Sequence, residues 1–520
     1  MWGNRGEVSE GASIALRVMT TPPNAPDDLP EQMRVRREKL QRLREDGIDP
    51  YAFGYARTLT IADLRTKFAG LDIDVVTGEQ VGIVGRVVLN RVSGKIIFAS
   101  LRDGTGDVQV MLTLDASGAE LLDRWKSDVD LGDHLGVTGE VITSKRGELS
   151  VLAKEFTITS KCLRPLPEKH AGLTDPEARV RQRYVDLIVR PEARDMLYLR
   201  STLVRGIRES LQRRGFTEVE TPMLQVMHGG ANARPFESHI NAYDMPVYLR
   251  IAPELYLKRI MVGGVEKVFE INRNFRNEGA DSTHNPEFTM LEMYEAYGDY
   301  NTMRILTQEV IQEAATAVFG SAVARRAQPD GEIKEFDLSG DWPVKTMLGS
   351  LSEALKEEVT LDTPVARLRK LAETFGLDED PTADAGMLLE ELYVELVESK
   401  TTTPVFYQDF PKNNAPLTRL HRDDARLTEK WDLVCWGAEQ GTGYSELIDP
   451  IDQRERFLQQ AGRAAGGDAE AMRLDEDFLR ALEFGMPPTG GQGMGIDRLI
   501  MTLTGLGVRD TILFPLVKPE

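Results

Sequence analysis

An arginine, several carboxylates and aromatic residues alternate along residues 268–294, a combination that can bind an anion and a cation in one cavity. At the period of a β-strand, one face of the first segment carries Val268, Glu270, Asn272, Asn274 and Arg276. After a loop over residues 277–286, a second strand places on one face Phe288, Met290, Glu292 and Tyr294. The pattern predicts a hairpin with its polar groups directed at one space, although polar alternation alone fits a solvated hairpin equally well.

The letters FRNEG and HNPEF within this hairpin favour the first interpretation. They resemble the second signature motif of class II aminoacyl-tRNA synthetases, and this copy is similar to that of the lysyl enzymes. In that chemistry an amino-acid carboxylate attacks the α-phosphate of ATP, so a guanidinium is needed where the negative charges meet. The resemblance assigns this role to Arg276, and it assigns binding of ATP also to Glu278, His284, Asn285 and Phe288. Thr283 stands where some lysyl enzymes have an arginine that contacts the γ-phosphate.

A second group of chemical residues lies in KWDLVCWGAEQGTGYSEL, where Thr442, Tyr444 and Glu446 repeat at period two. By the same resemblance, Asp432 and Glu439 are ligands of a Mg²⁺ ion that bridges the ATP phosphates, and oxygen ligands suit that hard cation. The aspartate is shorter than the glutamate of many members. Thr442 and Tyr444 replace an asparagine and a phenylalanine of the family, and the Thr442 hydroxyl is expected to donate a hydrogen bond to the substrate carboxylate.

The last signature is GGQGMGIDRLIM, in which Arg498 opens a helix and is expected to clamp the triphosphate and assist catalysis with Arg276. A glycine run before a helix is by itself most often a packing feature. In the segments HGGANARPF and LRIAPELYLKR, the resemblance places Gly230 and Glu254 beside the substrate's α-amino group. In isolation these two are a turn glycine and a surface glutamate.

The amino-acid substrate is inferred from the predicted pocket. Glu292 and Glu446 are expected to face the substrate side chain, with Tyr294 and Tyr444 as walls and with Arg276 and Thr442 at its carboxylate. Two carboxylates repel an aspartate but are neutralised by an ammonium group, which favours L-lysine. Ornithine has the same charge on a shorter side chain, so reach provides discrimination.

Composition fits a globular enzyme of two or three domains. The chain has 520 residues with 63 basic and 83 acidic side chains and a net charge of −20, which argues against a general nucleic-acid coat protein. Cys162 and Cys435 have neither zinc-site nor disulfide spacing. No apolar run approaches the roughly 18 residues of a membrane span, so we expect no membrane insertion and a cytoplasmic location.

The expected fold class is α+β, with an N-terminal OB-fold β-barrel followed by a class II catalytic domain in which helices flank an antiparallel sheet. The predicted divisions are a disordered extension at 1–28, a basic helix and the anticodon-binding barrel at 29–166, a linker at 167–185, and the catalytic domain at 186–520 with an insertion of helices and loops at about 301–430. The basic helix is expected to expose Arg34, Arg36, Arg37, Lys39, Arg42 and Arg44. Five short β-rich runs at 80–166 predict the barrel.

The resemblance assigns anticodon contacts to Arg91, Phe98, Gln109 and Glu148. Taken alone, Phe98 is more readily explained as a core residue. Leu199, Leu203, Ile207 and Leu211 mark a helical stripe before a strand that ends at Pro222, which resembles the first class II motif and implies a homodimer.

The predicted function is therefore that of a lysyl-tRNA synthetase acting on L-lysine, ATP and tRNA(Lys). Three alternatives remain. One is lysylation of a protein acceptor, which is disfavoured because relatives with that activity lack the barrel. The segments HINAYD, GDWPVKT and WDLVCWG also resemble the synthetase half of proteins that lysylate phosphatidylglycerol, so the chain could be a free-standing paralogue that supplies lysyl-tRNA for that reaction. It could also be a non-catalytic RNA-binding paralogue, which retention of Arg276, Arg498 and Glu439 disfavours.

Overall fold

The computed structural model describes residues 30–167, 173–281, 283–328, 330–377, 383–412, 415–465 and 472–519. It divides into two compact units, Met1–Gly172 and Leu173–Glu520, each with its own hydrophobic core. The predicted extension at 1–28 lies outside the described residues. Part of the predicted linker is helical, because it contains α5 (Pro176–Arg181) and the start of α6 (Arg183–Val189). Both helices lie in the second unit.

The first unit is a closed five-stranded barrel with the order β1-β2-β3-β5-β4. Its strands are β1 (Val76–Ser93), β2 (Ile96–Arg102), β3 (Asp107–Thr113), β4 (His134–Thr143) and β5 (Leu149–Ser160). Every second residue of β2 and β3 is buried, as a barrel with a filled interior requires. The short helices α2 (Ile61–Lys67), α3 (Leu114–Ser117) and α4 (Ala119–Asp128) complete the unit. The predicted OB-type barrel is confirmed.

The basic helix α1 (Glu31–Glu45) is less exposed than predicted. Arg36 is buried, and its Nη1 donates hydrogen bonds to the carbonyls of Cys162 (2.9 Å) and Arg164 (3.2 Å). Lys39 and Arg42 form ion pairs of 2.7 Å with Asp130 and Asp128. The prediction of a solvated basic face was therefore wrong for Arg36, whereas Lys39 is partly exposed and Arg42 is exposed. All three cations attach α1 to the barrel.

The second unit contains an eight-stranded sheet with the order β14-β15-β16-β17-β18-β11-β10-β6. The strands in this order are β14 (Val344–Thr346), β15 (Val405–Pro411), β16 (Leu427–Cys435), β17 (Ala438–Ser445), β18 (Thr489–Gly495), β11 (Glu287–Ala296), β10 (Lys267–Phe275) and β6 (Thr217–Glu218). Pairing is antiparallel from β15 to β10 and parallel at the two ends. The predicted antiparallel catalytic sheet is confirmed, and β10 and β11 form the predicted hairpin.

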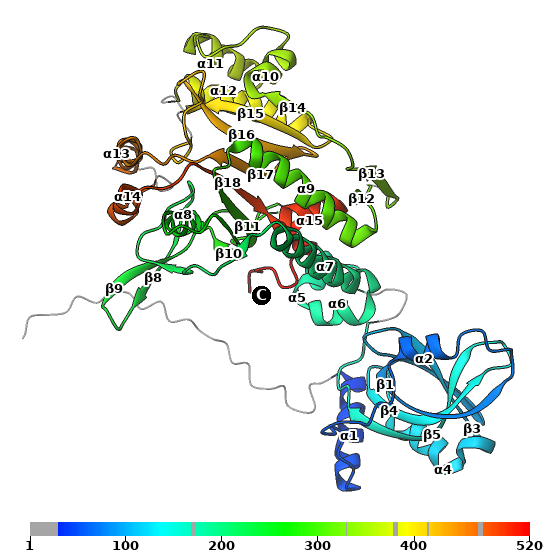
Figure 1. Cartoon of the computed structure of the whole chain (residues 1–520). Helices are drawn as coiled ribbons and strands as arrows, with labels where there is room; N and C mark the ends of the chain where they lie inside the picture. The colour runs from blue at the N-terminus through cyan, green and yellow to red at the C-terminus, as the bar shows by residue number, and fades with distance from the viewer. Residues whose placement is uncertain are drawn as a thin grey trace, which may run out of the picture. The chain divides into compact units, whose positions relative to one another are not determined.

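Helices α7 (Pro191–Arg213), α9 (Tyr300–Phe319) and α15 (Ile496–Thr504) cover the sheet and bury a large apolar core against it. Figure 1 shows α7 and α9 side by side over the sheet. In the predicted stripe of α7, Leu203, Ile207 and Leu211 are fully buried and Leu199 is partly buried. The strand expected after this helix is shorter than predicted, because only β6 pairs with β10.

The predicted insertion at 301–430 contributes strands as well as helices. Besides α9 it contains the hairpin β12 (Val323–Ala327) and β13 (Ile333–Asp337), the helices α10 (Met347–Leu355), α11 (Val365–Thr374) and α12 (Ala385–Leu396), and the 3₁₀ turn η2 (Glu398–Lys400). Strands β14 and β15 from this segment belong to the main sheet, so the description as helices and loops was incomplete.

The remaining elements lie near the β10–β11 end of the sheet or against α7. They are α8 (Glu254–Val262), α13 (Pro450–Ala465), α14 (Glu476–Glu483), α16 (Val508–Thr511) and the small sheet of β7 (Leu224–Gln225), β8 (Phe236–Ile240) and β9 (Met245–Leu249). Within the described ranges, no helix is both long and apolar enough to cross a membrane.

Candidate active site

One cavity of about 460 Å³ opens over the central strands of the second unit. Its walls come from β11, β16, β17 and β18, the starts of α8 and α15, and the loops around residues 230 and 280. Every site residue predicted in the catalytic domain lines it: Gly230, Glu254, Arg276, Glu278, His284, Asn285, Phe288, Glu292, Tyr294, Asp432, Glu439, Thr442, Tyr444, Glu446 and Arg498. Segments separated by more than 200 positions are thus brought to one place.

Strand register explains this convergence. Gly493 of β18 lies between Glu292 of β11 and Thr442 of β17, and Gly491 lies between Tyr294 and Tyr444. A Cβ atom at Gly491 would lie 2.0 Å from Glu446 Oε1 and 2.5 Å from Tyr294 Cε1. These glycines therefore leave the space into which larger side chains of the neighbouring strands project.

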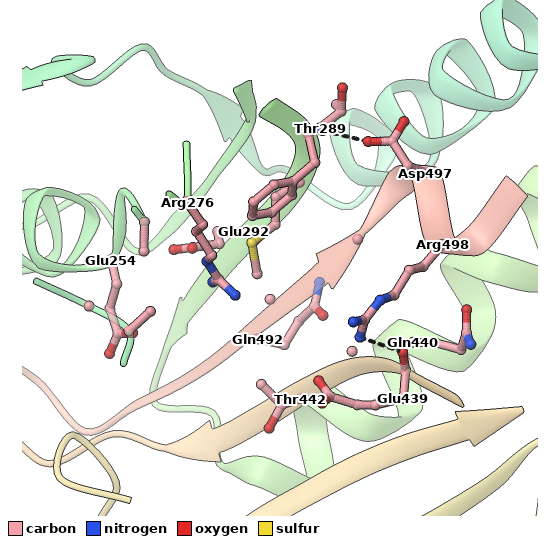
Figure 2. Close-up of a pocket in the computed structure, with 18 of the residues that line it drawn as sticks. Glu254, Arg276, Thr289, Glu292, Glu439, Gln440, Thr442, Gln492, Asp497 and Arg498 are labelled. Atoms are coloured by element: carbon pink, nitrogen blue, oxygen red, sulfur yellow. Dashed lines mark hydrogen bonds between the residues drawn. The ribbon is translucent and has the colours of Figure 1, made fainter. Parts of the chain in front are cut away.

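Two arginines face the cavity from different elements. Arg276 follows β10, and its guanidinium lies 5.1 Å from the ring centre of Phe288. Arg498 lies near the start of α15, where Nη1 donates to the Glu439 carbonyl at 3.1 Å and Nη2 lies 3.2 Å from His284 Nε2. Figure 2 shows both guanidiniums directed toward the same space. Burial lowers the pKa of Arg276, with the charges of Glu278 and Glu439 acting in the opposite direction, and an arginine stays protonated nonetheless.

The loop between β10 and β11 is held by Asp281. Its Oδ1 accepts hydrogen bonds from the backbone amides of Thr283 (2.6 Å) and His284 (2.8 Å), which hold its pKa below the usual range. The Thr283 hydroxyl donates to the same oxygen at 2.8 Å. Thr283 therefore stabilises the loop, where some relatives are expected to present an arginine.

Three carboxylates form the acidic end of the cavity: Glu254, Glu292 and Glu446, all buried. Tyr294 donates a hydrogen bond of 3.2 Å to Glu292. The pKa of Glu292 is raised well above its ordinary value by burial and by the charge of Glu254. Lys258 Nζ lies 2.7 Å from Glu254 Oε1 and is also ion-paired with Glu446. The prediction that Glu446 faces the cavity agrees with the structure, but its ion pair with a resident ammonium was missed. The i, i+4 spacing of Glu254 and Lys258 was the available signal.

Thr442 has a partner that the sequence did not reveal. Its hydroxyl donates to the backbone carbonyl of Trp431 at 3.1 Å, so donation to a substrate carboxylate requires that this bond be exchanged.

The predicted metal ligands lie in a second acidic group. Lys430 Nζ lies 3.0 Å from Asp432 Oδ2, and Glu398 Oε1 accepts a hydrogen bond of 3.2 Å from the Glu439 amide. Burial and the charges of Glu439 and Asp432 raise the pKa of Glu398 to about 7. Among the described residues no group of three or more histidine, cysteine or carboxylate side chains forms a complete metal cage. This arrangement fits a Mg²⁺ ion that takes only a few carboxylate ligands, since Mg²⁺ commonly takes the rest from phosphates and water.

The barrel presents the predicted anticodon residues on its outer face. Arg91 pairs with Phe98 across β1 and β2, and Gln109 of β3 donates from Nε2 to Ser150 Oγ at 2.8 Å. The neighbours Ile97 and Ala99 are buried while Phe98 is partly exposed, so the core interpretation of Phe98 was wrong. Glu148 is exposed and lies 3.7 Å from Arg65.

Two family models match this chain. The model of class II tRNA synthetases (D, K and N) covers residues 175–518, and the model of OB-fold nucleic acid binding domains covers residues 81–159.

A lysine–tRNA ligase of Mycobacterium tuberculosis (strain ATCC 25177 / H37Ra) is 55% identical over 501 residues, covering 95% of this chain and 98% of that protein. A lysine–tRNA ligase of Mycolicibacterium gilvum is also 55% identical, over 96% of this chain and 99% of that protein. The lysylphosphatidylglycerol biosynthesis bifunctional protein LysX of Nocardia farcinica is 52% identical over 94% of this chain but only 43% of its own length. The chain therefore belongs to the lysine–tRNA ligase family of class II tRNA synthetases.

Proposed function

We propose that the protein activates L-lysine with ATP and transfers it to the 3′ end of tRNA(Lys). The lysine carboxylate attacks the α-phosphate to form lysyl-adenylate and release pyrophosphate, and a ribose hydroxyl of the tRNA then displaces AMP. The observation that carries this proposal is a single cavity with two arginines toward one end and three buried carboxylates at the other. These ends match the anions and the ammonium groups of the two substrates.

At the arginine end, Arg276 is the catalytic cation for the lysine carboxylate and the α-phosphate. Charge grows on the phosphate oxygens in the transition state, and a guanidinium fixed against Phe288 stabilises it without reorganisation. Arg498 binds the outer phosphates. Glu278, His284, Asn285 and Phe288 hold the adenosine end of ATP.

At the acidic end, Glu292 and Glu446 receive the ε-ammonium group, and Gly230 and Glu254 lie beside the α-ammonium group. A Cβ on Gly230 would come within 3.0 Å of Glu254 Cβ, so glycine preserves the space there. Tyr294 and Tyr444 form the walls, and Thr442 lies toward the substrate carboxylate. A neutral or acidic side chain brings no positive charge to these three buried carboxylates, of which Lys258 compensates only one charge, and this difference is the source of specificity.

Asp432 and Glu439 are the residues that would hold Mg²⁺. When bound, the ion neutralises phosphate charge and helps to orient the pyrophosphate leaving group. Lys430 already compensates one charge of this group, so Asp432 offers the metal a carboxylate that is fixed in place.

In the barrel, Arg91, Phe98, Gln109 and Glu148 contact anticodon bases. A partly exposed aromatic ring on an OB-type face is suited to base stacking. The chain also forms a homodimer through the helix and strand around Pro222, next to which Met223, Leu224 and Val226 are exposed apolar residues. Sedimentation at micromolar concentration tests this assembly, since a monomer would exclude it.

The test of function is lysine-dependent exchange between ATP and pyrophosphate, followed by charging of a lysine tRNA transcript. Exchange with lysine but not with aspartate or norleucine, together with charging, supports the proposal. Exchange without charging would favour a specialised paralogue, and absence of exchange would favour a non-catalytic RNA-binding protein.

A further inference from the structure

Lys258 lies behind the acidic wall of the cavity. It is one helical turn after Glu254 on α8, its side chain is 0% exposed, and it is not among the cavity-lining residues. Nζ lies 2.7 Å from Glu254 Oε1, pairs with the Glu446 carboxylate and donates to the Leu417 carbonyl at 3.4 Å. Its hydrogen-bonding capacity is thus used by protein groups, and it joins two carboxylates that do face the cavity.

Burial makes this arrangement energetically sensitive. Burial alone would lower the pKa of Lys258, but the charges of Glu254 and Glu446 outweigh it and raise that pKa. In turn, burial raises the pKa of Glu446 to about 8 even though Lys258 acts to lower it. Without Lys258, the buried carboxylates of Glu254 and Glu446 would have no ion-pair partner among the described residues.

The charges of the site match those of free lysine. Glu254, Glu292 and Glu446 carry three negative charges when ionised, and Lys258 compensates one of them. The two that remain equal the two ammonium groups of the substrate, whose carboxylate is left for Arg276. The structure thus provides one ammonium group of its own and leaves space for two.

We propose, on the basis of the function proposed above, that Lys258 is a positioning residue for lysine recognition. It holds Glu254 and Glu446 toward the cavity and sets the charge of the site so that a substrate with two ammonium groups is preferred. Lys258 itself touches neither substrate, and it acts only through these two carboxylates.

The test is the K258M variant, in which an apolar side chain of similar length replaces the ammonium. We expect the KM for lysine in the exchange assay to rise about 10-fold to 100-fold, the range of a lost charged hydrogen bond, while the KM for ATP stays within twofold. The preference for lysine over norleucine should fall. K267M is the matched control, because it removes a lysine paired with Glu295 at 2.7 Å outside the cavity.

The pH profile separates positioning from a general structural role. The titratable groups around Glu446 are Glu254 and Lys258 of α8, Glu292 and Tyr294 of β11, and Tyr444 of β17. Removing Lys258 raises the pKa of Glu446 further, so in K258M the loss of lysine affinity on acidification should begin at higher pH than in the unaltered protein. Restoring a cation with K258R should move the profile back toward the original.

Thermal unfolding shows whether K258M is folded, and K258Q replaces it if it is not. A folded variant with unchanged lysine KM and pH profile would overturn the proposal, as would an equal rise of both KM values without a pH shift.

Calorimetry of lysine binding to the unaltered protein at pH 7, in buffers of different ionisation enthalpy, needs no variant. We expect release of at least one proton as the site becomes fully ionised, and binding without proton release would contradict the charge match. Failure of the unaltered protein to catalyse exchange would instead refute the proposed function.

Discussion

Replacing Gly491 by alanine should damage lysine binding through one added methyl group. The new Cβ would lie 2.0 Å from Glu446 Oε1 and 2.5 Å from Tyr294 Cε1, far inside normal contact. Neither neighbour moves freely, because Glu446 is paired with Lys258 and the buried Tyr294 donates a hydrogen bond to Glu292. Overpacking of this kind typically costs about 1–3 kcal/mol. If the whole cost falls on the substrate pocket, the KM for lysine rises about 5-fold to 150-fold.

Steady-state exchange with lysine and ATP varied separately measures this effect, and thermal unfolding measures any loss of stability. The KM for ATP should change less than twofold, because Gly491 lies among the lysine-side residues. Gly462 in α13 is a suitable control, since a Cβ there meets nothing within 4 Å and alanine favours the helix. A G491A variant that is folded and has the lysine KM of the unaltered protein would refute the steric reasoning.

Four further outcomes are expected. Arg276→Ala should lower lysine-dependent exchange roughly 100-fold to 1,000-fold without changing the melting temperature, and near-normal exchange would remove Arg276 from the mechanism. Phe98→Ala should lower tRNA charging by the roughly 1–3 kcal/mol of one base stack while leaving exchange unchanged; a parallel fall in both would contradict a role in tRNA binding. Glu446→Gln should raise the KM for lysine about 10-fold to 100-fold but not that for ATP, and the opposite pattern would make Glu446 a metal ligand. Because burial raises the pKa of Glu446 to about 8, its ionised form is lost as the pH falls through 8, so the KM for lysine should rise up to about tenfold per pH unit on acidification; a flat profile between pH 6.5 and 8.5 would argue against this titration.

The sequence predicted the fold and the catalytic cavity because the relevant information is local. Period-two alternation over residues 268–294 determines which side chains share a strand face, and the glycines of β18 determine where neighbouring strands leave space. The order of the signature motifs then fixed the family. Short strands without such a pattern were missed, since β14 has only three residues and pairs at the edge of the sheet.

Buried cations were the main failure of prediction. Lysine and arginine are rarely fully buried unless they are paired, and pairing depends on tertiary contacts that one sequence does not display. Arg36 uses the carbonyls of Cys162 and Arg164, more than 120 positions away. Lys258 uses a carboxylate on its own helix and another from the segment after β17. Each looks like a surface residue until the chain is folded.

Lys258 also makes the two carboxylates predicted to bind the substrate's ε-ammonium group, Glu292 and Glu446, unequal in how strongly they should attract it. Glu446 is already paired with Lys258, whereas Glu292 forms no ion pair among the described residues and accepts a hydrogen bond from Tyr294. An incoming ammonium group therefore adds to an existing ion pair at Glu446, but supplies the first ion-pair partner at Glu292. Because a buried carboxylate without an ion-pair partner has the most to gain from a cation, Glu292 should provide the larger part of the attraction. Lys258 holds Glu446 in place. Glu446 should therefore contribute mainly to selecting a side chain of lysine's length, by fixing where its ammonium group must lie.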